Sequence, residues 1–96
     1  MKIRILGDAE QDLLDGASFY EKQSLGLGDY FIDSLFADID SLQLYAGIHV
    51  KKFGYYRLLS KRFPYAIYYT VQGEVIDIYA ILDCRRNPSK SEDRLK

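Results

Sequence analysis

Basic and tyrosine side chains alternate through the second half of the chain, and their types suit them to bind anions. Guanidinium and ammonium groups neutralise phosphates, while aromatic rings stack on unpaired bases. On one face of a sheet, residues two apart would join into a continuous surface. The alternative is structural: these residues stack on one another and pair with the acidic half of the chain. The set comprises Lys51, Lys52, Arg57, Lys61, Arg62, Arg85 and Arg86, interleaved with Tyr55, Tyr56, Tyr65, Tyr68 and Tyr69.

Cysteine and histidine offer little further chemistry, because the chain has one of each, Cys84 and His49. A single cysteine excludes an internal disulfide and a four-cysteine metal site. A single histidine excludes a two-histidine acid–base pair. Arg85 and Arg86 beside Cys84 could make it reactive, but a small buried thiol at a strand end is commoner. We therefore expect no metal and no cofactor.

Charges are segregated along the chain, although its net charge is only −1. Residues 1–46 carry three Lys or Arg and nine Asp or Glu, a net −6, whereas residues 47–96 carry ten and five, a net +5. This predicts a dipolar surface with a basic side open to an anionic partner, unless the two halves neutralise each other in the fold. The length of 96 residues fits one domain. Without a membrane-spanning run or signal-peptide core, we expect a soluble cytoplasmic protein.

The acidic half predicts two amphipathic helices. Asp8 and Gln11 resemble a capping box at the start of the first helix. Apolar residues then recur at spacings of three and four over residues 9–20, and a second, more apolar stripe covers residues 31–45. Only a short glycine-containing break at residues 26–28 separates them, so we expect an antiparallel helix hairpin.

The basic half predicts strands, because the hydrophobic period there changes to two. Residues 2–5 form a further short strand, which must join an edge of the same sheet to satisfy its backbone. We expect an α+β, two-layer fold: an N-terminal strand and a helix hairpin packed on one face of a roughly four-stranded, mainly antiparallel sheet. One domain would cover residues 1–88 and a flexible polar tail residues 89–96. The basic-half strands are expected at 56–61, 65–71 and 75–82, with a turn at Gln72-Gly73.

Two segments, Arg62-Phe63-Pro64-Tyr65 and the closing Arg85-Arg86-Asn87-Pro88, make the chain resemble the RelE/ParE toxin superfamily. The resemblance covers about residues 2–88. It implies a sheet with two N-terminal helices packed on it, in agreement with the elements above. It also implies a toxin of a bacterial type II toxin–antitoxin pair, silenced by a cognate antitoxin whose C-terminal segment docks as a helix or an added strand. The sequence leaves open whether the toxin also forms a homodimer.

The resemblance implies two alternative targets. ParE-like members inhibit DNA gyrase by binding, whereas RelE-like members cut mRNA on the ribosome by assisting attack of a ribose 2′-hydroxyl on the adjacent phosphate. Leu59 and Ala66 stand where the nuclease branch tends to carry a lysine and an arginine, and neither can move a proton or stabilise phosphate charge. A pI near 5.7 also fits poorly with a cleft lined by rRNA. Gyrase inhibition is therefore favoured over an mRNA endoribonuclease or a degenerate toxin that only binds antitoxin.

The expected site is a cationic patch on the sheet. In a ribonuclease, the resemblance implies Arg85 on the scissile phosphate and a basic role for Arg57. Lys61, or else Lys51 or Lys52, would take the basic roles that Leu59 and Ala66 cannot fill. The prediction depends on these cations gathering over one side of the sheet, unpaired with carboxylates. The binding patch would comprise Arg57, Arg62, Tyr68, Arg85 and Arg86.

Overall fold

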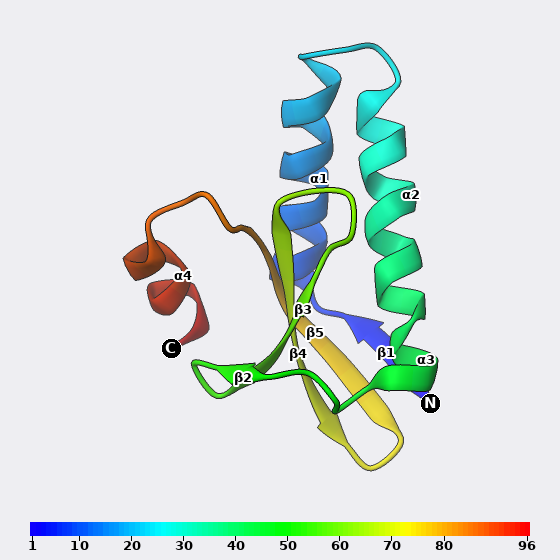
Figure 1. Ribbon diagram of the computed structural model, residues 1–96, viewed down its shortest axis with the longest axis vertical. Coiled ribbons are helices and arrows are strands. Elements are labelled where there is room, and N and C mark those ends of the chain that lie inside the picture. Colours follow the sequence, from blue (N-terminus) through cyan, green and yellow to red (C-terminus); the bar gives the residue numbers. More distant parts are fainter.

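A computed structural model describes all residues, Met1–Lys96, as helices packed against one sheet (Figure 1). None of the helices combines the length and apolar character needed to cross a membrane. The elements in chain order are β1 (Lys2–Ile5), α1 (Gly7–Glu21), α2 (Leu27–Asp40), α3 (Leu42–Tyr45), β2 (Lys51–Lys52), β3 (Tyr55–Leu59), β4 (Tyr65–Gln72), β5 (Val75–Asp83) and α4 (Pro88–Leu95).

The sheet has five strands in the order β1-β5-β4-β3-β2. β1 runs parallel to β5, and the other neighbours are antiparallel. The α+β architecture with a helix hairpin on one face is confirmed. The additional strand is β2, whose two residues are too few to show an alternating pattern. Gly73, with φ of +58°, allows the tight turn between β4 and β5.

The main core lies between the α1–α2 hairpin and the facing side of the sheet. Phe31 and Leu35 of α2 and Tyr69 of β4 are completely buried there. The two helices approach closely at Gly28, where an added Cβ would lie 2.7 Å from the backbone oxygen of Ala17. Glycine at this position therefore lets α1 and α2 pack as a tight pair.

Two details of the helices differ from the sequence prediction. The capping box is wrong: α1 begins one residue before Asp8, its N-cap has no side-chain bond, and Gln11 Nε2 donates instead to Asp15 Oδ1 at 2.9 Å. The second helix is also interrupted at Ser41, whose hydroxyl bonds back to the carbonyl oxygen of Asp38. Such local bonds compete with the helical ladder, which leaves α3 as a separate short turn of helix.

The opposite face of the sheet is partly covered by α4, where the sequence predicts a flexible polar tail. Asn87 caps this helix by accepting a hydrogen bond from the Ser89 amide at 3.0 Å, and Pro88 occupies the first turn. Leu95 is buried in a small second cluster with Ala66, Tyr68 and Ala80. A single apolar residue in the segment gives no periodicity, so the sequence pattern does not reveal this helix.

Candidate functional site

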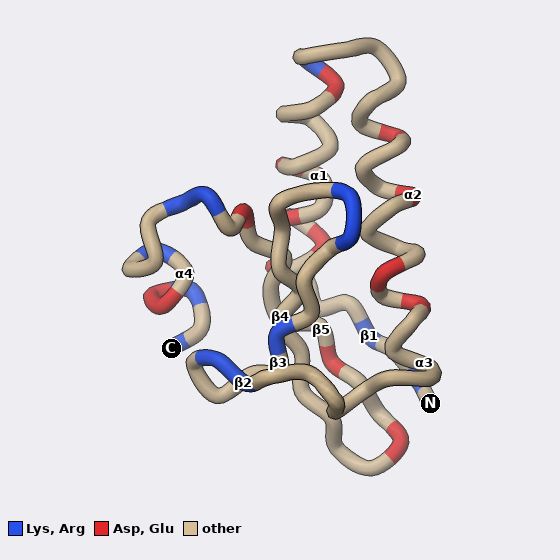
Figure 2. Tube along the Cα trace, viewed as in Figure 1, with Lys and Arg blue, Asp and Glu red and all other residues tan.

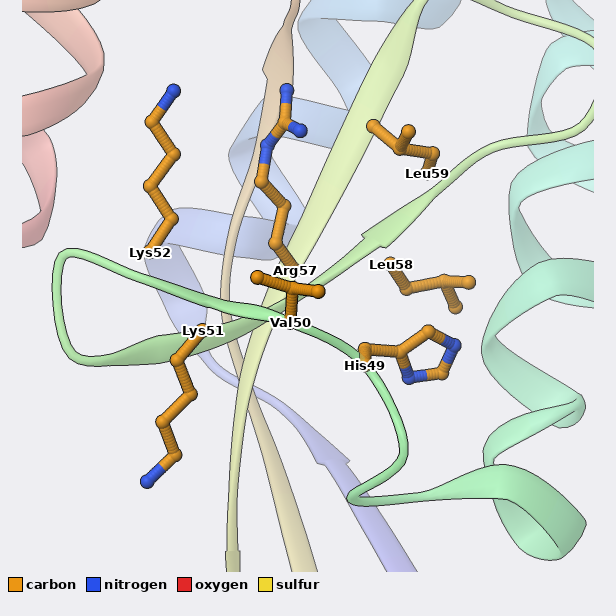
Figure 3. A pocket seen from close by; sticks show the side chains of 7 residues that line it. All are labelled: His49, Val50, Lys51, Lys52, Arg57, Leu58 and Leu59. Carbon is orange, nitrogen blue, oxygen red and sulfur yellow. The ribbon is translucent and has the colours of Figure 1, made fainter.

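A groove of about 600 Å³ lies along the outer side of β2 and β3, and we call it the edge groove. Figure 3 shows Lys52 and Arg57 extending the same way while Lys51 points the opposite way. Val50 and Leu59 are exposed apolar residues of this groove, at 82% and 54%. The lining residues are His49, Val50, Lys51, Lys52, Arg57, Leu58 and Leu59.

The backbone of β3 is unpaired along part of this groove. The Arg57 amide donates to the Val50 carbonyl at 3.0 Å, whereas the Ser60 amide donates in the other direction, to Tyr65 of β4, at 2.9 Å. Because successive residues of an antiparallel strand direct their polar groups to opposite sides, the Leu59 N–H and C=O share the direction of Arg57. They lie beyond the end of the two-residue β2. The outer edge of β3 is therefore open at Leu59.

Of the predicted binding patch, Arg57 is the residue that lines this groove. Its Nε donates to the hydroxyl of Tyr68 at 3.1 Å, and its Nη2 lies 3.6 Å from Cys84 Sγ. Its guanidinium makes none of the ion pairs of the structure, so no carboxylate neutralises its charge. Tyr68, predicted as a surface contact, is only 3% exposed and holds Arg57 from within the fold. Cys84 is exposed at the end of β5, not buried as expected.

Arg85 is placed differently. Its Nε and Nη2 bond to both carboxylate oxygens of Asp83, at 3.0 and 2.9 Å, and Nη2 lies 3.4 Å from the Tyr20 hydroxyl. The hydrogen bond from Arg85 lowers the pKa of Asp83 from its usual value. Asp83 therefore already neutralises Arg85, which lies near Tyr20 of α1. Arg85 does not line the edge groove with Arg57.

The remaining predicted cations occupy two other places. Lys61 and Arg62 are exposed in the loop between β3 and β4, where they appear as a basic segment at the end of the sheet (Figure 2). Arg86 lines a smaller cavity of about 110 Å³ that also includes Asp15 and Arg94. The cations expected in a single patch are therefore divided among the edge groove, the β3–β4 loop and the segment after β5.

His49 also lines the groove, although nothing in the sequence marks it as a site residue. Its Nδ1 contacts the hydroxyl of the completely buried Tyr69, which also accepts a hydrogen bond from the Gly47 amide at 3.0 Å. Gly47 has φ of +91°, a conformation that favours glycine. Desolvation lowers the pKa of His49 from its ordinary value. The segment leading into β2 is thus anchored to the sheet, and no sequence pattern signals this contact.

Comparisons with known proteins agree with this architecture. Among solved structures, the chain is similar to one from the chromosomal ParDE TA system of P. aeruginosa, with a TM-score of 0.72 and 21% identity, covering 84% of this chain and 92% of that chain. At that identity the likeness establishes the fold. A search of curated proteins finds no match. The family model described as the ParE toxin of the type II toxin–antitoxin system parDE matches residues 3–88. Since this match spans the chain from β1 to the start of α4, the protein belongs to the ParE toxin family of type II toxin–antitoxin systems.

Proposed function

We propose that this ParE-family protein inhibits DNA gyrase in the cytoplasm by binding to it, and that a cognate antitoxin silences it. The family match over residues 3–88 is the observation that carries the proposal, since it falls in the ParE branch of the superfamily. Gyrase is the target that the sequence resemblance implies for that branch. The geometry of the edge groove and the surroundings of Arg57 support a protein that acts through binding surfaces.

The edge groove suits the antitoxin. An extended segment lying beside β3 would accept a hydrogen bond from the Leu59 amide and donate one to the carbonyl of the same residue. Its apolar side chains would cover Val50 and Leu59, which are now exposed. Its acidic side chains would meet Lys52 and Arg57 at the border of the groove. The fitting occupant is therefore an extended segment with both apolar and acidic residues.

A second copy of the chain fits this groove less well. Pairing two such edges would bring Lys51, Lys52 and Arg57 of one copy towards the same residues of the other. Like charges placed opposite each other destabilise paired strands, and such repulsion also disfavours association. The charge pattern therefore favours a different, acidic partner at this edge over a homodimer.

The surroundings of Arg57 favour binding over RNA cleavage. A ribonuclease needs groups that accept and donate protons beside the scissile phosphate. The Tyr68 hydroxyl next to Arg57 is buried. Ala66, where the nuclease branch tends to carry a basic residue, is buried in the cluster with Leu95. Leu59, at the other such position, contributes an apolar side chain to the groove.

Two assays on the same preparation test the proposal. Purified toxin is added to a gyrase supercoiling reaction, and separately to translated mRNA that is then analysed by primer extension. We expect inhibition of supercoiling, relieved by stoichiometric antitoxin, and no new transcript ends. Codon-positioned cuts without inhibition of gyrase would instead establish the endoribonuclease. Absence of both effects, with normal growth on induction of the toxin alone, would indicate a degenerate toxin.

A further inference from the structure

The loop between β3 and β4, residues 60–64, is tied to α2 by a buried carboxylate. Asp38 is 5% exposed and accepts hydrogen bonds from the Ser60 hydroxyl at 2.7 Å and the Lys61 amide at 3.4 Å. Both groups that donate to its carboxylate are neutral groups of the loop. The start of the loop therefore has a fixed position relative to the helix hairpin.

The second half of the loop is held by aromatic packing. The Phe63 ring lies 4.8 Å from the ring of Tyr20, 5.0 Å from that of Phe31 and 5.6 Å from that of Tyr30, measured between centroids. The Pro64 carbonyl accepts a hydrogen bond from the Cys84 amide at 2.7 Å. Phe63 is thus wedged against both helices, and the whole loop is preorganised.

The two charges that this loop carries have no carboxylate partner. Lys61 and Arg62 are exposed and take part in none of the ion pairs. In contrast, Arg4, Arg85 and Arg94 each bond to an aspartate at 2.6 to 2.9 Å. A loop with a fixed backbone that presents adjacent unpaired cations can meet an anionic surface without the cost of ordering its backbone, which favours binding.

We propose that this loop, which we call the β3–β4 tip, is the surface through which the toxin contacts its target, and that the target offers it an acidic protein segment. The inference rests on the proposed function, inhibition by binding. The tip is distinct from the edge groove, because none of residues 60–64 lines that groove. The tip and the groove therefore serve two partners.

A protein partner fits the tip better than a nucleic acid. α2 packs against the tip through Tyr30 and Asp38, and the same helix exposes Asp29, Asp33 and Asp40. A phosphate backbone long enough to bind tightly would pass these carboxylates, and the repulsion would offset contacts with two cations. A short acidic segment avoids them, and the half-exposed ring of Tyr30 adds apolar contact next to the charges.

The double variant Lys61→Glu with Arg62→Glu tests the tip. Its matched control is Lys22→Glu with Lys90→Glu, which makes the same change in net charge at two exposed lysines without ion pairs. Growth inhibition, gyrase supercoiling, antitoxin affinity and thermal unfolding are measured for both. We expect the tip variant to lose growth inhibition and to need at least tenfold more protein to inhibit gyrase. Its antitoxin Kd should change less than threefold, and the control should behave as the wild type.

The outcomes separate this inference from the proposed function. A tip variant that inhibits gyrase and growth like the wild type would overturn the proposal that the tip contacts the target. If the wild type is toxic without inhibiting gyrase, and only the tip variant loses toxicity, the gyrase proposal fails and the tip stands with another target. If the wild type binds a single-stranded RNA or a DNA duplex in fluorescence anisotropy, and the tip variant does not, the assignment to a protein partner is overturned. A non-toxic wild type would overturn both proposals.

Discussion

The backbones of β5 and β3, towards opposite edges of the sheet, differ in how far they are covered. On the β5 side, β1 covers the strand as far as Ile78, and Asp12 then accepts a hydrogen bond from the Ile81 amide at 3.0 Å. Arg94 holds that carboxylate with two bonds of 2.8 and 2.9 Å. On the β3 side, the backbone at Leu59 has no strand beside it. Unpaired strand edges invite pairing with other chains. The open backbone at Leu59, in contrast to the covered backbone of β5, supports the binding edge that we propose.

The largest effect is expected from Asp12→Ala, which uncovers the backbone of β5 at Ile81. The change leaves the buried Ile81 amide without an acceptor and Arg94 without its partner. We expect a loss of about 2 kcal/mol in the free energy of unfolding, the usual cost of an unsatisfied buried donor and a lost charged hydrogen bond. Urea denaturation measures it. Asp33→Ala, at an exposed position in the middle of α2, is the control and should change stability by less than about 0.5 kcal/mol. Equal stability of the two variants would show that Asp12 does not close the edge.

The open side is tested by Val50→Asp, which places a negative charge in the edge groove. Because Val50 is exposed, the stability of the free toxin should change by less than about 0.5 kcal/mol. Affinity for an apolar and acidic antitoxin segment should fall at least tenfold, or about 1.4 kcal/mol. Leu44→Asp, at an 81% exposed residue of α3 outside the groove, is the calorimetry control. Unchanged binding by the Val50 variant would place the antitoxin elsewhere.

Arg57 and Arg85 differ in whether a carboxylate already neutralises them. Arg57→Ala should weaken antitoxin binding severalfold, by about 1 kcal/mol, because its unpaired charge borders the groove. Arg85→Ala should leave that affinity unchanged, since Asp83 already neutralises Arg85. Its effect on stability should also stay below about 1 kcal/mol, as for other exposed ion pairs. Calorimetry and thermal unfolding of both variants provide the data. A larger loss of affinity from Arg85→Ala would reverse the assignment.

The smallest expected effect concerns pH and His49. Desolvation lowers its pKa in the folded protein, so the unfolded chain binds the proton more readily. The free energy of unfolding should therefore fall as the pH drops through about 6.5 towards the folded value. His49→Asn keeps an acceptor near Tyr69 without titrating, and this part of the pH dependence should disappear. NMR titration of the only imidazole gives the pKa directly. A value above 6.5 would contradict the prediction.

The sequence predicted those helices and strands whose residue pattern follows from local burial. Apolar stripes predicted α1 and α2, and alternation predicted β4 and β5, because burial on one face repeats with the geometry of the element. The closed edge was beyond such patterns, since Asp12 and Arg94 are separated by 82 positions. β2 and α4 were missed because the first has two residues and the second a single buried side chain.

The candidate site shows the same division. The sequence marked Arg57 by its charge and strand position, but could not show that α4 covers the face on which Tyr68 lies. Arg85 also looked available, although Asp83 two residues earlier in the chain was a partner that the sequence offered. The open edge at Leu59 depends on where β2 ends, and this is a property of the assembled sheet.

Cys84 gives the molecule a built-in attachment point. It is exposed, it is the single cysteine of the chain, and its sulfur lies 3.6 Å from Nη2 of Arg57, a residue that lines the groove. The emission of a maleimide fluorophore attached there should change when a peptide segment binds along β3. Arrival and departure of an antitoxin could then be followed in real time, without introducing any new residue.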